Sequence, residues 1–125
     1  MREKSMRSFI SHTDHGAVAV KSTGPYPIGV DMEPKSRLVD TGALDQIAAE
    51  EVKKQTPYPT NLETWMAIEA VSKATGYGLS ISREISYSRG VWKVKGESWK
   101  VDFEQRLVGG VHHLVSIARL ITEAP

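Results

Sequence analysis

The sequence predicts a single α+β domain over residues 1–125, with an antiparallel sheet and two main helices packed on one face of it. Three observations support this class. Strand-like segments open the chain, two segments with helical periodicity follow, and alternating apolar and polar residues then continue almost to the C-terminus. With 125 residues, of which 40% are apolar, the chain can form one core of ordinary size.

The first strand-like segments are "GAVAVK" (16–21) and "IGVDME" (28–33), separated by the turn residues "STGPYP". We expect them to be neighbouring strands. The next segment, "TGALDQIAAEEVKKQ" (41–55), places apolar residues at helical spacing, with Asp40 or Thr41 as a possible N-cap residue. We predict one amphipathic surface helix there, which ends before the two prolines of "TPYPT".

A second helix is predicted over "NLETWMAIEAVSKATGYG" (61–78). Thr60 begins a Thr-x-x-Glu capping box, and either Gly76 or Gly78 tolerates the left-handed backbone that commonly ends helices. From Ser82 onward, four segments alternate apolar with polar residues and are separated by "SRG", "GES" and "GG". They predict the antiparallel strands of the sheet.

Two charged residues of the second helix share its apolar stripe. At about 100° per residue, five positions fall within about a third of the helix circumference; they are Leu62, Trp65, Met66, Glu69 and Lys73. A Glu and a Lys in this order, four residues apart, are also a common surface pair that stabilises a helix by a few tenths of a kcal/mol. Two interpretations therefore stay open: a surface pair, or charges that face a cleft where a metal and a phosphate are their partners.

Further candidate site residues lie nearer the start of the chain. Asp31 and Glu33 are two residues apart, so on an extended strand both carboxylates project from one face and Met32 from the other. The pair could hold a hard divalent cation such as Mg²⁺ if Glu69 supplied a third oxygen, or it could be solvated at a strand end. The segment "SHTDHG" adds His12, which could bind phosphate, ligate a metal or be an ordinary loop residue.

Composition argues against several classes of function. There are 16 basic and 15 acidic residues, a net charge of +1, which argues against an extensive nucleic-acid surface. No apolar run approaches the roughly 20 residues that span a membrane, and we identify no secretion signal, so we expect a cytoplasmic protein without membrane contact. The chain contains no cysteine, which excludes disulfides and thiolate chemistry.

Some conspicuous residues are interpreted as structural. The adjacent histidines His112 and His113 would point to opposite faces of a strand, which is poor geometry for sharing a metal. Trp92, Trp99 and Phe103 lie among lysines, but strand alternation favours aromatic side chains in the core and lysines in solvent.

Three segments in order, "SHTDHGAVAV", "IGVDMEP" and "WMAIEAVSK", resemble the signatures of the 4′-phosphopantetheinyl transferase superfamily. Those signatures are a Ser-His strand followed by small residues, then Gly-(Val/Ile)-Asp-x-Glu, then (Trp/Phe)-x-x-Lys-Glu-(Ala/Ser)-x-x-Lys. The resemblance covers roughly residues 8–80 by motif and is closest to the second half of the surfactin-synthetase-activating class. It implies the fold of one half-unit of that class.

The resemblance implies transfer of the 4′-phosphopantetheine group of coenzyme A to a serine of an acyl or peptidyl carrier protein, as in fatty acid or polyketide biosynthesis, with release of 3′,5′-ADP. It implies that Asp31, Glu33 and Glu69 hold Mg²⁺ against the pyrophosphate. Lys73 would contact a phosphate, and His12 the 3′-phosphate end of the nucleotide. Glu69 and Lys73 would be the catalytic residues, with Glu69 or a metal-bound water taking the serine proton.

One position departs from the motif, because Ile68 stands where the family has Lys. This loss of positive charge motivates an alternative, a catalytically impaired homologue that acts as a coenzyme A or carrier-protein binding module. An unrelated α+β interaction domain is a third interpretation. Because a half-unit should leave an apolar inner face, we also expect a homo-oligomer, either a dimer or a trimer.

Overall fold

The computed structural model describes residues 7–22 and 24–122, which form an α+β structure with two antiparallel sheets. The strands are β1 (Arg7–Thr13), β2 (Gly16–Ser22), β3 (Ile28–Pro34), β4 (Ser86–Ser88), β5 (Val91–Val94), β6 (Glu97–Val108) and β7 (Val111–Leu120). The helices are α1 (Thr41–Ile47), α2 (Glu50–Gln55) and α3 (Asn61–Thr75), followed by the 3-10 helix η1 (Gly78–Glu84). No helix in this described part of the chain has both the length and the apolar character needed to cross a membrane.

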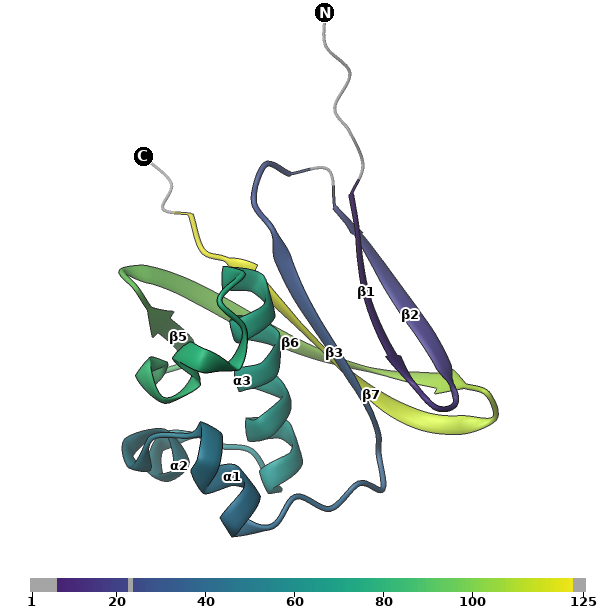
Figure 1. Cartoon of the computed structure of the whole chain (residues 1–125), viewed down its shortest axis with the longest axis horizontal. Helices are drawn as coiled ribbons and strands as arrows, with labels where there is room; N and C mark the ends of the chain where they lie inside the picture. The colour runs from purple at the N-terminus through teal and green to yellow at the C-terminus, as the bar shows by residue number, and fades with distance from the viewer. Residues whose placement is uncertain (1–6, 23, 123–125) are drawn as a thin grey trace, which may run out of the picture.

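The larger sheet has the strand order β3-β7-β6-β5-β4, and the β1–β2 hairpin forms a sheet of its own. In Figure 1, β3 runs between α3 and this hairpin. A cluster of apolar side chains joins the hairpin to the larger sheet; it consists of Ile28, Val30, Met32, Val115 and Ile117, with Phe9, Val18, Val20 and Val108 packed against it. Because side chains alternate along a strand, Gly29 and Asp31 point to the opposite face of β3, toward α3.

Gly29 sets the distance between β3 and α3. A Cβ atom at this position would lie 1.7 Å from the carbonyl oxygen of Ala70 and 2.8 Å from the backbone nitrogen of Ala74. No side chain fits in that space, so the helix lies directly on the backbone of the strand. Beside it, the Ser116 hydroxyl of β7 donates a 2.9 Å hydrogen bond to the Met66 carbonyl of α3.

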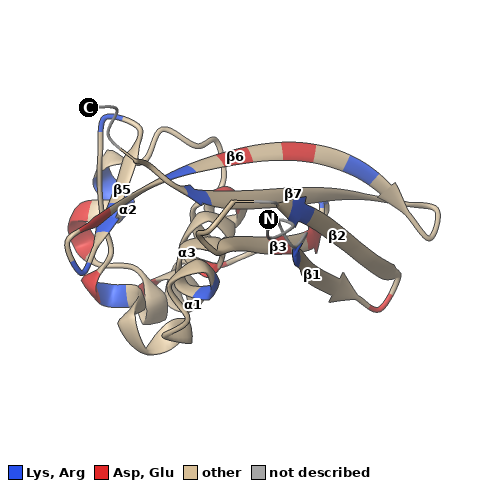
Figure 2. Ribbon diagram, turned by 90° about the horizontal axis from the view of Figure 1, so that it is seen from above, with Lys and Arg blue, Asp and Glu red and all other residues tan. Residues whose placement is uncertain are grey.

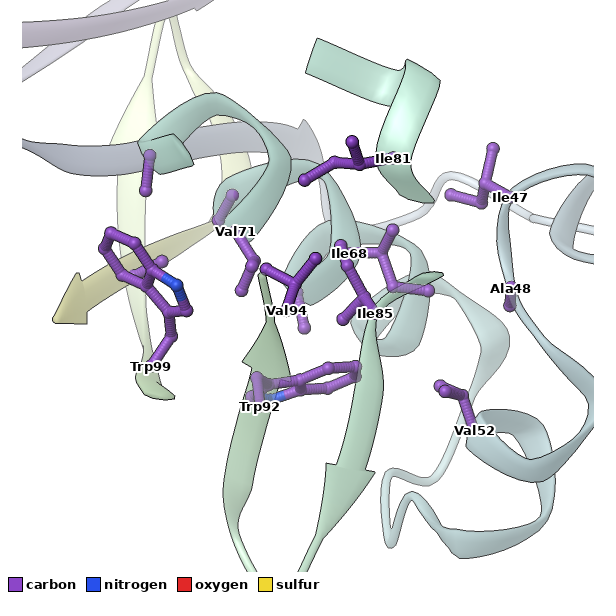
Figure 3. Packing of buried hydrophobic residues seen from close by; sticks show 14 of the residues in the cluster. Ile47, Ala48, Val52, Ile68, Val71, Ile81, Ile85, Trp92, Val94 and Trp99 are labelled. Carbon is purple, nitrogen blue, oxygen red and sulfur yellow. The ribbon is translucent and has the colours of Figure 1, made fainter. Parts of the chain in front are cut away.

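The larger core cluster packs against another side of α3, through helix residues that include Ile68 and Val71 (Figure 3). Its members include Ile47, Val52, Ile68, Val71, Ile81, Ile85, Trp92, Val94 and Trp99. Trp92 and Trp99 are each 1% exposed, whereas Lys93, Lys95 and Lys100 are exposed. This confirms the prediction that the tryptophans of this segment lie in the core and its lysines in solvent.

Charged residues alternate along β6, as the red and blue bands of Figure 2 show; they are Lys100, Asp102, Glu104 and Arg106. The intervening Val101 and Phe103 pack against the larger core cluster. Alternation of charged and apolar residues is typical of an antiparallel strand that has one face in the core and the other in solvent.

The buried His113 fastens the hairpin to the larger sheet. Its Nδ1 lies 2.8 Å from the Val111 carbonyl oxygen, and its Nε2 lies 3.0 Å from Thr13 Oγ1. Because a carbonyl only accepts, Nδ1 donates, and in the neutral ring Nε2 accepts a hydrogen bond from the threonine hydroxyl. His112 is exposed, so the two adjacent histidines point to opposite faces, as predicted.

The structure confirms several predicted elements. Thr60 is the N-cap residue of α3, and the helix ends at Gly76, whose φ of 80° is left-handed. The Thr60 side chain does not form its half of the predicted capping box, because its hydroxyl donates to the Glu63 carboxylate and it makes no hydrogen bond to a helix amide. Asp40 is the N-cap residue of α1 and accepts a 2.7 Å hydrogen bond from the Ala43 amide. The segments after Ser82 form antiparallel strands, although Ser82 itself lies in η1.

Two predictions about elements were wrong. The segments at 16–21 and 28–33 are not neighbours, because β2 pairs with β1 through a tight turn and β3 pairs with β7. The single helix over 41–55 is two short helices, since Ala48 and Ala49 have extended backbone. Ala48 is 1% exposed, so the chain bends where it enters the core, and apolar spacing alone fits a broken helix as well as a continuous one.

We predict that Gly29→Ala destabilises the protein by at least the upper end of the roughly 1–3 kcal/mol that overpacking usually costs, because its Cβ meets helix backbone rather than a movable side chain. The control is Gly42→Ala in α1, whose Cβ would lie at an ordinary 3.4 Å from Asp40 Oδ1. Urea unfolding measures both. Equal stability of the two variants would contradict the close approach of α3 to β3.

Candidate functional site

The packing of α3 on β3 brings together side chains from two separate sequence motifs. Lys73 Nζ lies 3.2 Å from Asp31 Oδ1 and donates a 3.0 Å hydrogen bond to the Val30 carbonyl. Glu69 lies one turn before Lys73 on α3, and Glu33 lies two residues after Asp31 on β3. The negative charges of Glu33 and Glu69 both act on Asp31. Asp31, Glu33, Glu69 and Lys73 therefore form one cluster, which we call the carboxylate site.

Arg37 also belongs to this site, and the sequence analysis missed it. Its backbone amide donates a 3.0 Å hydrogen bond to the Pro34 carbonyl, so the chain turns back after β3. Its Nη1 then lies 2.5 Å from Glu33 Oε2, and its guanidinium carbon lies 5.3 Å from the centre of the Trp65 ring. The only signal in the sequence is an Arg four residues after Glu33, which has no structural meaning until the turn is known.

Trp65, Glu69 and Lys73 follow one another at intervals of four residues, so they form a line along α3. Leu62 and Met66 are buried as predicted, but Trp65 and Glu69 are half-buried and Lys73 is exposed. The two charges thus lie at the margin of the buried face and not in its middle. The reason is that α3 is buried on most of its circumference, so this line lies where the helix meets solvent.

Asp31 is an unusual carboxylate because it is only 6% exposed. Its Oδ2 is buried and accepts no hydrogen bond from the described residues. Burial raises the pKa of Asp31 to about 7; Lys73 opposes this rise, and Glu69 and Glu33 add to it. Burial also raises the pKa of Glu69, again with Lys73 opposing. A buried carboxylate oxygen in this situation is best satisfied by a cation or a proton.

The chemistry of the site fits Mg²⁺, which prefers carboxylate oxygens and tolerates only a few protein ligands. Asp31, Glu33 and Glu69 are the residues that would hold the ion. Within residues 7–22 and 24–122, no three acidic or histidine side chains are already gathered as a metal site. Asp31 and Glu33 each face a cation instead, Lys73 and Arg37 respectively.

The structure places His12 away from the carboxylate site. It lies on β1, where Phe9 and Ser11 point toward the sheet and His12 is exposed on the outer face of the hairpin. The hairpin packs on the face of β3 that carries Val30 and Met32, opposite to Asp31. His12 is therefore not brought together with the other candidate residues.

Ile68 is also outside the site. Its side chain is 0% exposed and packs in the larger core cluster with Ile81 and Ile85 (Figure 3). The position directly before Glu69 thus points into the core of this chain. A side chain there does not reach the margin where Glu69 and Lys73 meet solvent.

The carboxylate site opens to solvent, because the side chains of Lys73 and Arg37 are 42% and 41% exposed. Two recesses of about 300 and 420 Å³ lie instead at the N-terminal end of α3, where both are lined by Thr60. Neither is lined by Asp31 or Lys73. An open site of this kind can admit a ligand that remains attached to, or is shared with, a macromolecular partner.

The raised pKa of Asp31 predicts how stability changes with pH. Unfolded Asp loses its proton near pH 3.8, whereas folded Asp31 keeps it until about pH 7, so this residue's contribution to stability falls as pH rises through that window. Asp31→Asn keeps the shape without the charge. Its stability advantage over the wild type should grow between pH 5 and pH 8 by on the order of 2–4 kcal/mol.

Urea unfolding at both pH values measures this difference, with Asp102→Asn on the exposed face of β6 as the control. A difference between Asp31→Asn and wild type that does not change with pH would contradict the burial of a titrating carboxyl.

Comparison with known proteins adds no assignment to this geometry. No family model matches the chain, and neither a curated protein nor a solved structure is detectably similar to it.

Proposed function

We propose that this protein is a Mg²⁺-dependent 4′-phosphopantetheinyl transferase, built as one half-unit of that fold. One observation carries the proposal: Asp31 and Glu33 on β3 and Glu69 and Lys73 on α3, which belong to two motifs that resemble the signatures of that superfamily, lie at a single site. The buried Asp31 Oδ2 supports it further, because no group in the described part of the chain donates a hydrogen bond to this oxygen and a metal ion could bind it.

The proposed reaction forms a bond from a carrier-protein serine oxygen to the phosphorus on the pantetheine side of the coenzyme A pyrophosphate. The bond from that phosphorus to the bridging oxygen breaks, and 3′,5′-ADP leaves with the electron pair. Bound Mg²⁺ supplies neutralisation of charge on the phosphate oxygens.

Two residues of the chain have separate tasks in this reaction. The Lys73 side chain is 42% exposed and can turn from Asp31 to a phosphate oxygen as charge develops there. Glu69 lies at the solvent margin, where it or a metal-bound water could take the serine proton.

The predicted homo-oligomer remains part of the proposal. Ile10, which is 63% exposed, shares the outer face of the hairpin with His12, Ala17 and Ala19. A second copy that covered this face would bury apolar surface and bring His12 to an interface. In this proposal, His12 of one subunit therefore contacts a nucleotide that is bound at the carboxylate site of the other subunit.

The alternative function is a module that binds coenzyme A or a carrier protein without turnover. The Ile at position 68, where the family has Lys, motivated this alternative. Because Ile68 is buried in the core, it contributes to packing and is not placed to contact a phosphate. Ile68→Lys would place an ammonium group among Ile81, Ile85 and Val94 and unfold the protein before it could restore activity.

The test is intact-mass spectrometry of apo carrier proteins after incubation with coenzyme A, Mg²⁺ and this protein. We expect a mass gain of one phosphopantetheine group, reduced at least about 100-fold in rate by Glu69→Gln, in line with the usual loss of a general base. The control is Glu63→Gln in the first turn of the same helix. No gain with any carrier would refute the transferase, and coenzyme binding by calorimetry would then favour the binding module.

A further inference from the structure

We propose that Arg37 binds a phosphate of the ligand and that Glu33 holds it in place until a metal ion takes over that carboxylate. This inference rests on the proposed function, because it assumes a ligand with adjacent phosphates and a divalent cation. Arg37 is then the second positively charged side chain of the carboxylate site, beside Lys73.

The contacts of Arg37 place its guanidinium at the open margin of the site. The turn after β3 fixes its backbone through the 3.0 Å hydrogen bond to the Pro34 carbonyl. The Trp65 ring, one turn before Glu69 on α3, supports one face of the guanidinium. The side chain of Arg37 is 41% exposed, whereas that of Glu33 is 15% exposed, so the cation lies on the solvent side of the pair.

The donors of Arg37 suit a phosphate better than its present partner. A guanidinium has five N–H donors in a planar fork. Among residues 7–22 and 24–122, this side chain makes one hydrogen bond, from Nη1 to Glu33. The remaining donors can bind phosphate oxygens in the bidentate manner that favours arginine over lysine at such sites.

Charge balance shows why this one residue matters. With every group ionised, Asp31, Glu33 and Glu69 contribute −3 and Lys73 and Arg37 contribute +2, a sum of −1. A divalent cation changes that sum to +1, and the site then attracts a polyanion. Without Arg37 the same sum is zero.

Two other positions near the site, Ile68 and Lys35, do not supply this charge. Ile68 lies in the core, and Lys35 reaches away from the carboxylates to Gln105, with 3.3 Å between Nζ and Oε1. Lys35 is nevertheless an exposed cation only two residues from Arg37. It is therefore the matched control.

Isothermal titration calorimetry with Mg²⁺ alone, and with inorganic pyrophosphate in excess Mg²⁺, tests the proposal. Arg37→Gln should weaken pyrophosphate binding about 10- to 100-fold, the usual effect of losing a hydrogen bond to a charged group. It should leave Mg²⁺ binding unchanged or tighter, because Glu33 loses its competing cation. Arg37→Lys should restore part of the pyrophosphate affinity, and Lys35→Gln should bind as the wild type does.

Three results would overturn the proposal: unchanged pyrophosphate affinity in Arg37→Gln, an equal loss of Mg²⁺ affinity, or a wild type that binds Mg²⁺ but no pyrophosphate. The second result would assign Arg37 a structural role only, and circular dichroism of both Arg37 variants checks that they are folded. Coenzyme A is titrated separately. A wild type that binds pyrophosphate through Arg37 but does not bind coenzyme A would refute the transferase function and leave the role of Arg37 intact.

Discussion

The close contact of α3 with β3 at Gly29 is the constraint on which the rest of this structure depends. Because nothing projects from position 29, the helix backbone at Ala70 lies against the strand, and Lys73 reaches both the Val30 carbonyl and Asp31. The same contact covers Asp31 and raises its pKa. A wider separation would solvate the carboxylate and separate the residues of β3 from those of α3.

The burial of Asp31 also depends on the other face of the sheet. The hairpin covers β3 from that side through the smaller apolar cluster, and His113 fastens it there. Asp31 consequently lies in a strand that is covered on both faces, where a charge is costly without a partner. The protein is thus less stable at neutral pH than it would be with a neutral residue at position 31, a cost that is understandable at a site for a cation.

Local signals in the sequence predict the parts of this structure that depend on local interactions. The ends of α3 follow from Thr60 and Gly76, and the shared orientation of Asp31 and Glu33 follows from strand alternation. The pairing of β3 with β7 could not be predicted, because it joins residues that are 79 (Pro34 and His113) to 91 (Ile28 and Arg119) positions apart and that no local rule links. The positions of Arg37, His12 and Ile68 relative to the site likewise depend on a turn, on the sheet face that the hairpin covers, and on the orientation of α3.

The measurement that tests the account most directly is an anomalous difference map from crystals soaked in Mn²⁺, which binds the same oxygen ligands as Mg²⁺. The account predicts a peak at the carboxylate site, where Asp31, Glu33 and Glu69 are the residues that would hold the ion. The contrary result is a map without a peak at this position, at Mn²⁺ concentrations that saturate the protein in solution, with the pair of Lys73 and Asp31 intact.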